Sequence, residues 1–449
     1  MLPVLLLLAC TPKDPGQDSS PPLPQPAPAR PAEPAAWVAP GTLDSSAFPW
    51  APQAGDPSAD GVILSVRSDL DQLTGLVMVE DGAGGWVEHS RPLLQREEGS
   101  LVARARLSDL PADRAFTWAA YPAEPGEGVA RSGVGRFRTA TDADSWRTLV
   151  VAATSCLGGN PPLPNMSRVA EQAPDLGLLL GDIVYADDAT TLEEYRAYWD
   201  EVMRQPGQAD FVGGMGVVAT WDDHEVTNNY ERAELAPGRF EDALAAFRES
   251  MPQELGPQGG VWRRQSWGAI LDVFVLDVRS ERDPAAGLYI GAEQEQWLLD
   301  GLRDSPAAFK LVLTTVPITD YTDFIGEIQA EDRWQGWPEQ RDRVLTTIDE
   351  AGIEGLLWLA GDVHFAAVST LAVPGTDDPG QSQVEVLAGP AGSFPNVAAD
   401  LYEGETGQYL SMFSTFNSLL LSFDPGLMAV DVVHLGDDGA ELSRIRLEL

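Results

Sequence analysis

The stretch Val217-Val218-Ala219-Thr220-Trp221-Asp222-Asp223-His224-Glu225 joins a short apolar strand pattern to three acidic residues around one histidine. Gathered in a folded chain, these carboxylates would repel one another unless a cation lay among them. Polar residues directly after a strand are typical of sites in open α/β sheets, which form at the carboxyl ends of the strands. The stretch therefore predicts an α/β fold with a metal site at one edge of its sheet.

Three other segments repeat this arrangement of an apolar strand followed by possible ligands. They are Thr154-Ser155-Cys156, Leu180-Gly181-Asp182-Ile183-Val184-Tyr185 and Leu359-Ala360-Gly361-Asp362-Val363-His364. Taken alone, a Gly-Asp pair after a strand is often only a turn, and a Ser-Cys pair is a weaker signal still. Together, carboxylate, imidazole, amide, phenol and thiol groups form a mixed ligand set that suits a ferric-type ion beside a harder divalent ion.

Around these segments, residues 143–449 read as one α/β domain, in which near-continuous apolar strands alternate with helical patterns. Strands are predicted at Thr148–Ala153, Leu176–Leu180, Val217–Thr220, Ala269–Leu276, Lys310–Thr314 and Gly355–Ala360. Helices are predicted at Leu192–Arg204, Glu241–Glu249, Gly291–Leu302 and Gln340–Ala351. The tail from Val384 to Leu449 returns to strand patterns, which we expect to complete the second sheet of a layered sandwich.

Residues 58–142 have a different pattern, with short alternating runs separated by Gly, Asp and Pro. Runs such as Val62–Val66 and Phe116–Tyr121 have the period of two expected for half-buried strands. We predict a small antiparallel β-sandwich here, and the turn at Leu110–Asp113 before an aromatic strand resembles a fibronectin type III-like module.

The N-terminus reads as an export and attachment segment. Residues 1–10 form a short apolar leader ending in Leu7-Leu8-Ala9-Cys10, which resembles a bacterial lipobox. Residues 11–57 are rich in Pro and Ala and predict a disordered tether. We expect a lipoprotein held at the cell envelope, at the outer membrane, by its lipid anchor alone; a periplasmic or secreted protein is the alternative.

The chain has two cysteines, so lipidation of Cys10 would leave Cys156 without a disulfide partner. A lone thiol in an exported protein is then either a buried apolar filler or a metal ligand. The formal net charge of −40 makes binding to nucleic acid unfavourable. We expect a monomer.

From about Asp60 to the C-terminus, the chain resembles the PhoD-like alkaline phosphatases of the calcineurin-like metallophosphatase superfamily. The motifs that carry the resemblance stand in family order: Ser155-Cys156, Gly181-Asp182-Ile183-Val184-Tyr185, Trp221-Asp222-Asp223-His224-Glu225-Val226-Thr227-Asn228-Asn229-Tyr230, Leu276-Asp277-Val278-Arg279, Gln296-Trp297-Leu298 and Gly361-Asp362-Val363-His364. The resemblance implies a four-layer α/β/β/α sandwich and a metal-dependent hydrolase of phosphoric esters.

The resemblance also implies a set of metal ligands. A ferric ion would be held by Cys156, Asp182, Tyr185 and His364, with Asp182 bridging to one or two calcium ions. The calcium side would be formed by Asp223, Asn229 and Asp362. Spacing leaves open the choice between Asp222 and Asp223, and that between Asn228 and Asn229.

Two residues are candidates for a direct role in catalysis. The superfamily pattern places the equivalent of His224 near the leaving-group oxygen, and we expect Asp222 and Glu225 to hold its other ring nitrogen. A third metal ligand is the alternative role for this histidine. Arg279 is the candidate for contact with a substrate oxygen, with Arg282 behind it. We expect metal-bound hydroxide to attack phosphorus in line.

The substrate is left open by these motifs. An alkaline phosphatase acting on small monoesters is the first hypothesis, and a phosphodiesterase of the phospholipase D type, acting on phospholipid among other esters, is the second. A catalytically inert tethered binding protein is the third. The aromatic segment Pro317–Pro338 is either a pocket rim or a surface loop packed by its own aromatic residues.

Overall fold

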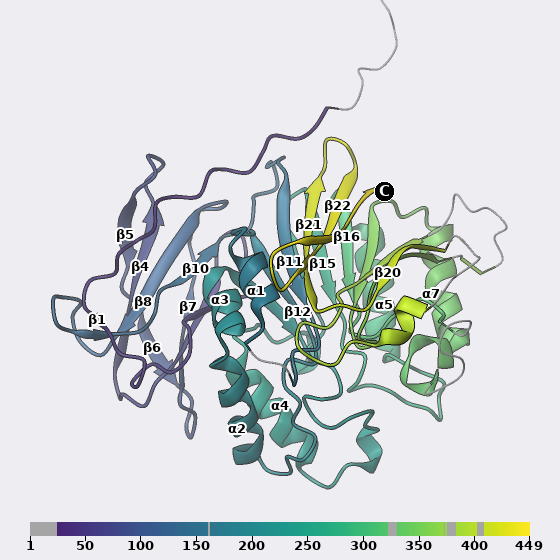
Figure 1. Ribbon diagram of the computed structural model, residues 1–449, viewed down its shortest axis with the longest axis horizontal. Coiled ribbons are helices and arrows are strands. Elements are labelled where there is room, and N and C mark those ends of the chain that lie inside the picture. The colour runs from purple at the N-terminus through teal and green to yellow at the C-terminus, as the bar shows by residue number, and fades with distance from the viewer. Residues whose placement is uncertain (1–24, 160–161, 322–329, 372, 375–382, 402–407) are drawn as a thin grey trace, which may run out of the picture.

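The structure is a computed structural model that describes residues 25–159, 162–321, 330–371, 373–374, 383–401 and 408–449. Two large β-sheets pack face to face from the centre to the right of Figure 1, where helices cover their outer faces, and the first sheet continues to the left of the view. The predicted four-layer α/β/β/α sandwich is therefore confirmed.

The first sheet contains fourteen of the described strands, in the order β10-β8-β4-β6-β7-β3-β2-β13-β12-β11-β21-β22-β23, with β5 paired to β4. Its part within the α/β domain includes β11 (Leu149–Thr154), β12 (Leu176–Leu180) and β13 (Gly216–Thr220), which run parallel. The antiparallel strands β21 (Asn417–Asp424), β22 (Ala429–Gly436) and β23 (Glu441–Glu448) extend it at one edge.

The second sheet contains seven described strands, in the order β14-β15-β16-β17-β19-β18-β20. Their bounds are β14 Arg263–Trp267, β15 Leu271–Val275, β16 Phe309–Leu313, β17 Leu356–Ala360, β18 Ala366–Leu371, β19 Gln383–Leu387 and β20 Tyr409–Phe413. Strands β15, β16, β17 and β19 are parallel. Their carboxyl ends therefore lie at one edge of the sheet, where a site can be assembled from successive loops.

Each face of the two sheets has its own apolar core. Alternate residues of the facing strands, such as Val151, Leu178 and Leu311, form the core between the sheets. The opposite face of the first sheet packs against α1 (Pro164–Ala170), α2 (Leu192–Met203), α3 (Pro206–Gly214) and α4 (Arg239–Ser250). The opposite face of the second sheet packs against α5 (Ala292–Asp304) and α7 (Pro338–Glu350).

The N-terminal module lies at the left of Figure 1. Strands β3 (Val62–Arg67), β6 (Leu93–Arg96) and β7 (Val102–Leu107) face β4 (Leu73–Glu80), β8 (Ala115–Tyr121) and β10 (Gly135–Arg138) across an apolar core, and β5 (Trp86–Ser90) pairs with β4. This arrangement agrees with the two-layer sandwich expected for residues 58–142. Its likeness to a fibronectin type III module stays a prediction.

The tether expected over residues 11–57 is wrong for the part from residue 25 onward. This part contains β1 (Thr42–Leu43), paired with β9 (Ala130–Arg131), and β2 (Gln53–Gly55), which pairs with both β3 and β13. Phe48 and Trp50 are buried. The apolar surface that these two side chains bury stabilises an ordered conformation of the Pro-rich chain. The sequence pattern does not predict β2, because three residues are too few to show the alternation of a strand.

The predicted leader and Cys10 lie outside the described residues. Within the described part of the chain, no helix is long and apolar enough to cross a membrane.

Candidate metal centre

Four loops converge at the carboxyl ends of the strands. Cys156 follows β11, Asp182 follows β12, Asp223 follows β13 and Asp362 follows β17, so both sheets contribute. Adjacent loops are joined through the backbone, since Leu157 N–H donates to the Asp182 carbonyl at 2.8 Å. The loops pack so closely that a Cβ atom on Gly181 would lie 2.7 Å from that of Asp222. The four predicted segments therefore do meet at one place.

The backbone of these loops is strained where ligands were expected. Cys156, Asp182, Asn229, Asp362 and His364 all have left-handed φ angles, between 49° and 64°. Residues other than glycine adopt this conformation at a cost and tend to do so at functional sites. Here the left-handed turns end the strands sharply and direct the side chains into a common space.

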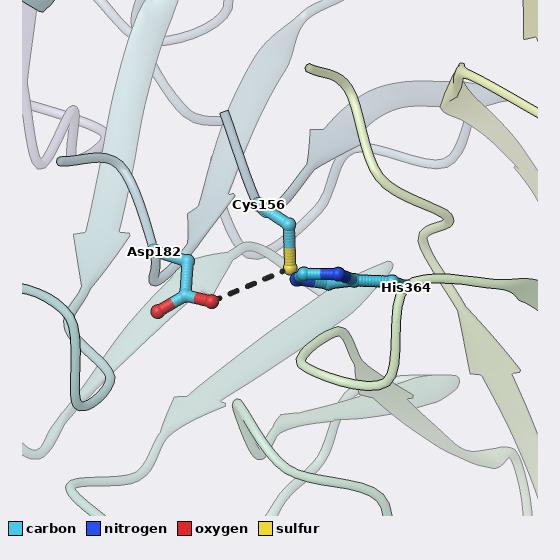
Figure 2. A group of neighbouring side chains, drawn as sticks. All are labelled: Cys156, Asp182 and His364. Atoms are coloured by element: carbon cyan, nitrogen blue, oxygen red, sulfur yellow. Dashed lines mark hydrogen bonds between the residues drawn. The ribbon is translucent and has the colours of Figure 1, made fainter. Parts of the chain in front are cut away.

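The first group of side chains is the one expected to hold a ferric ion. Ligand atoms of Cys156, Asp182 and His364 lie within 4.8 Å of one another, and Figure 2 shows the three side chains directed toward one another, with Cys156 Sγ 3.6 Å from Asp182 Oδ2. The hydroxyl of Tyr185 joins them, at 3.2 Å from Asp182 Oδ2 and 3.1 Å from His364 Nε2. All four predicted ligands are therefore together.

Two further groups adjoin the first. One contains Asp182, Asp223 and His224, and the other contains Asp222, Asp223 and Asp362. Asp182 is shared with the first group, as its expected bridging role requires. Asn229 is joined to the site by its backbone N–H, which donates to Asp223 Oδ2 at 2.5 Å, whereas Asn228 is exposed and donates from its backbone to Asp187.

Buried acidic groups are concentrated at this site, which makes binding of cations there favourable. Burial and the neighbouring carboxylate of Asp223 raise the pKa of Asp182 well above its usual value, and burial with the charge of Asp222 does the same to Asp362. Burial and the Asp182 carboxylate likewise raise the pKa of the Cys156 thiol and the Tyr185 phenol. The buried atoms Asp182 Oδ1 and Asp222 Oδ2 have no hydrogen-bond donor among the described residues. Unmatched buried carboxylate oxygens of this kind are suited to metal ions, so the donor set fits the implied group.

His224 reaches this cluster, but its partner differs from the prediction. Its Nδ1 atom lies 2.9 Å from both carboxylate oxygens of Asp187, and its ring stacks on Tyr185 at a centroid distance of 4.0 Å. Burial opposes its charge, but the hydrogen bond to Asp187 and the charge of Asp223 raise the pKa of His224 to about 9. The expectation that Asp222 and Glu225 hold this ring is wrong, because both face other partners.

Glu225 connects the loop that follows β12 with the loop that follows β13. Its fully buried carboxylate accepts hydrogen bonds from the backbone N–H groups of Asp182 at 3.1 Å, Ile183 at 2.6 Å and Asp222 at 2.8 Å. Burial raises the pKa of Glu225 to about 7, against the opposing effect of these donors. This residue holds two ligand loops at a fixed separation.

Arg279 is placed differently from the prediction. Its side chain is completely buried, and it donates from Nε to Asp222 and from Nη1 to Asp332. Arg282 also pairs with Asp332, at 3.0 Å. The guanidinium of Arg279 therefore contacts acidic groups of the site itself, which does not support its expected contact with a substrate oxygen. Asp332, on the loop between β16 and α7, carries no motif that would have revealed it in the sequence.

Two aromatic residues in the described part of the segment Pro317–Pro338 have buried side chains. Tyr321 is buried against Phe365, and Trp334 is buried with its Nε1 atom 3.0 Å from Thr314 Oγ1. Phe324 lies outside the described residues. Both contacts of Tyr321, with Phe365 and Tyr409, and the contact of Trp334 with Tyr289 join the segment to rings outside it. The described aromatic residues therefore support neither a pocket rim nor a loop packed by its own aromatic residues.

Sequence comparisons match this chain to known phosphatases. The family model described as PhoD-like phosphatase matches residues 151–416. Alkaline phosphatase D of Bacillus subtilis (strain 168) is 26% identical over 383 residues, which span 71% of this chain and 65% of that protein, slightly less than two thirds of its length.

Solved structures share the fold. A structure of PhoD superposes with a TM-score of 0.73 at 20% identity, covering 90% of this chain and 94% of the other. A purple acid phosphatase isolated from yellow lupin (Lupinus luteus) seeds superposes with a TM-score of 0.66 at 12% identity, covering 89% and 75%. At these identities, the likeness establishes the common architecture.

Proposed function

This chain belongs to the PhoD-like phosphatase family, and on that premise we propose that it is a metal-dependent hydrolase of phosphoric esters. One observation above all supports the proposal. Asp182 belongs both to the group of Cys156 and His364 and to the group of Asp223 and His224. A carboxylate shared between two ligand groups is the arrangement that a two-metal hydrolytic site needs.

For the metals, we propose a ferric ion at the first group and calcium next to it, where the shared Asp182 adjoins Asp223 and Asp362. Cys156, Tyr185 and His364 offer thiolate, phenolate and imidazole, which suit a ferric-type ion more than calcium. Asp223 and Asp362 offer carboxylate oxygens, which calcium prefers. Asn229 belongs to the proposed calcium side by its position next to Asp223.

When bound, such cations neutralise the oxygens of a phosphoric ester and lower the pKa of water. The side chains then have separate roles. Because Asp187 engages Nδ1 of His224, its Nε2 atom is the ring nitrogen left to meet the leaving-group oxygen. A proton held there assists departure of the alcohol. We expect the attacking oxygen to come from water, so a single turnover in heavy-oxygen water labels phosphate only. Trapping of a phosphorylated side chain would refute this route.

The family leaves the ester type open. We propose activity on monoesters and on diesters, including the phosphodiesterase activity of phospholipase D type on phospholipid. A panel of matched monoesters, diesters and phospholipids, assayed with calcium present, tests this directly. Asp182→Asn, which removes the shared charge, should abolish turnover of every substrate on the panel, whereas Asp188→Asn changes an exposed neighbour and serves as its control.

The competing view is a tethered binding protein with an inert α/β domain. Elemental analysis after native purification separates the two views. Iron and calcium near one or more equivalents per chain, with turnover of any ester on the panel, support the hydrolase. A folded, metal-free protein that hydrolyses none of the esters would overturn it.

We also propose attachment to the cell envelope through a lipid on Cys10. The first described residues, from residue 25, lie along the folded body, with Thr148 N–H donating to the Pro28 carbonyl at 2.8 Å. The Cys10→Ala variant should appear in the soluble fraction, while the unchanged protein should partition into detergent. Equal partitioning of the Cys10→Ala variant and the unchanged protein would contradict the proposed lipid anchor.

A further inference from the structure

One of the three ligand groups of the centre consists of carboxylates alone and already has a cation beside it. Asp222, Asp223 and Asp362 bring carboxylate oxygens within 4.8 Å of one another. The guanidinium of Arg279 lies against all three, through a hydrogen bond from Nε to Asp222 Oδ1 and distances from Nη2 of 3.7 Å to Asp223 Oδ1 and 3.6 Å to Asp362 Oδ1. Three mutually repelling carboxylates are thus held together by one positive charge.

This guanidinium is fixed in place. Its side chain is 0% exposed, and Asp332 accepts from Nη1 and, at 3.3 Å, from Nη2. Its backbone N–H donates to Asp277 Oδ1 at 3.2 Å. An arginine stays charged at every pH at which a protein folds, and its planar donors match carboxylates in fixed directions. The charge is therefore a permanent part of the site.

Asp182, which the other two ligand groups share, differs in this respect. In the described part of the chain, the ion pairs of Arg279 reach Asp222, Asp223, Asp332 and Asp362, and none reaches Asp182. Asp182 Oδ1 is also a buried oxygen without a donor. Asp182 itself thus has no arginine beside it in the described part of the chain, whereas each carboxylate of the third group has Arg279. One positive charge offsets part of the three negative ones, and among the described residues Asp222 Oδ2 is still a buried oxygen without a donor.

We propose that Arg279 is an internal cation of the metal centre, which occupies the place that a further divalent ion would take among Asp222, Asp223 and Asp362. The inference rests on the proposed function, because it presumes that the groups sharing Asp182 bind metals. Arg279 then sets how many ions the centre holds and keeps Asp223 and Asp362 in position beside the bound ones. It is a positioning residue rather than one that contacts substrate.

The test counts calcium ions. Calorimetric titration with calcium and elemental analysis are applied to the whole chain and to Arg279→Ala, which empties the space among the carboxylates. We expect Arg279→Ala to bind one calcium ion more per chain than the unchanged protein. Arg279→Lys, which keeps a charge there, should bind the unchanged number.

Arg282→Ala is the matched control. Arg282 also pairs with Asp332 and has a buried side chain, but within the described chain it forms no ion pair with Asp222, Asp223 or Asp362. We expect its calcium count to equal that of the unchanged protein. A folded Arg279→Ala with an unchanged count, or a gain shared by Arg282→Ala, would overturn the inference.

If Arg279→Ala does not fold, the unchanged protein decides the matter. In crystals grown with saturating calcium, the guanidinium should remain on Asp222, and an ion bound to Asp222 with Arg279 displaced would contradict us. Failure of this inference can be distinguished from failure of the proposed function. An unchanged protein that binds no metal and hydrolyses no ester would contradict the hydrolase proposal. An active, metal-loaded unchanged protein, with an Arg279→Ala variant that binds no additional calcium, would contradict this inference alone.

Discussion

The Nδ1 atom of His224 lies 2.9 Å from each of the two carboxylate oxygens of Asp187, which is 37 positions earlier in the chain. Asp187 also accepts the backbone N–H of Asn228, at 2.6 Å, so it is held against the loop that carries the histidine. The ring is confined further by its stacking on Tyr185. Its orientation is therefore set before a substrate arrives.

The Asp187→Asn variant tests what this contact does. With the carboxylate removed, the pKa of His224 should fall from about 9 toward its usual value, because the amide gives less stabilisation to the charged ring. The protonated form is the acid, so a lower pKa means that activity on alkyl phosphates is lost at a lower pH. We expect kcat for these esters to fall by about 10–100-fold at pH 8–9. A pH profile identical to that of the Asp188→Asn control would show that Asp187 does not act through the ring.

The His224→Asn variant separates an acid from a metal ligand. An acid catalyst matters most for alcohols that leave poorly, so alkyl phosphates should lose about 10²–10⁴-fold in kcat while nitrophenyl phosphate loses far less. Iron and calcium contents should not change. Equal losses on both substrates, together with loss of metal, would assign His224 as a ligand.

Glu225 should matter for the geometry of the loops. Glutamine in its place keeps one acceptor oxygen but turns an amide N–H₂ toward backbone donors, which leaves buried N–H groups unmatched. Each such group costs about 1–3 kcal/mol, so we expect Glu225→Gln to destabilise the fold by about 2–4 kcal/mol and to lose metal. Glu385→Gln is the matched control, because buried Glu385 accepts the backbone N–H groups of Ile318 and Thr319. It should lose comparable stability, measured by denaturant unfolding, and retain its metal; metal loss in both variants would make the effect unspecific.

Cys156 and Tyr185 give the proposed ferric ion an optical signature. Thiolate and phenolate bound to ferric iron should produce visible charge-transfer absorption, so the protein should be coloured as isolated. Cys156→Ser and Tyr185→Phe should each shift or bleach the band, whereas Tyr198→Phe, on helix α2, should leave it unchanged. A colourless, active protein loaded with zinc would rule out the iron assignment.

His434 lies away from the proposed metal ligands, and we expect it to make the free energy of unfolding decrease in acid. The ring is buried, its Nε2 lies 3.1 Å from the Leu387 carbonyl and its Nδ1 has no partner among the described residues, so burial lowers the pKa of His434 from 6.5 to about 4. A lowered pKa means that the unfolded chain binds the extra proton first. The stability that the fold gains from keeping His434 neutral is therefore fully present above pH 6.5 and is lost as the pH falls toward 4. By linkage, unfolding at pH 5 should show a loss of the order of 2 kcal/mol relative to pH 7, which His434→Gln should lack. The same pH dependence in both proteins would contradict the assignment.

The sequence predicts the strands and their ligand-bearing ends well, because both depend on short-range pattern. Each predicted strand and helix of the α/β domain has a counterpart in the structure within two or three residues, as with Leu176–Leu180 and Leu192–Met203. Cys156, Asp182, Tyr185 and His364 meet because parallel strands place their carboxyl ends together.

The partners of these residues could not be predicted in the same way. Asp187 and Asp332 are brought to the site by loops whose paths depend on tertiary packing, and neither stands in a distinctive pattern. The sequence favours contact between Arg279 and substrate, because an arginine near a phosphate site is expected to bind an anion. In the structure its guanidinium lies instead among Asp222, Asp332 and Asp362, which tertiary packing brings together.

Strand β2 has a consequence for how this chain can be divided. Gln53–Gly55 pairs with β3 of the N-terminal module on one side and with β13 on the other, and β13 leads directly into Trp221-Asp222-Asp223. The module is thus a protective neighbour for the strand that delivers metal ligands, rather than an appendage joined by a hinge. Genetic exchange or an engineered fusion that enters at residue 58 would leave that strand with an open edge, whereas one that enters before residue 53 would carry the neighbour along.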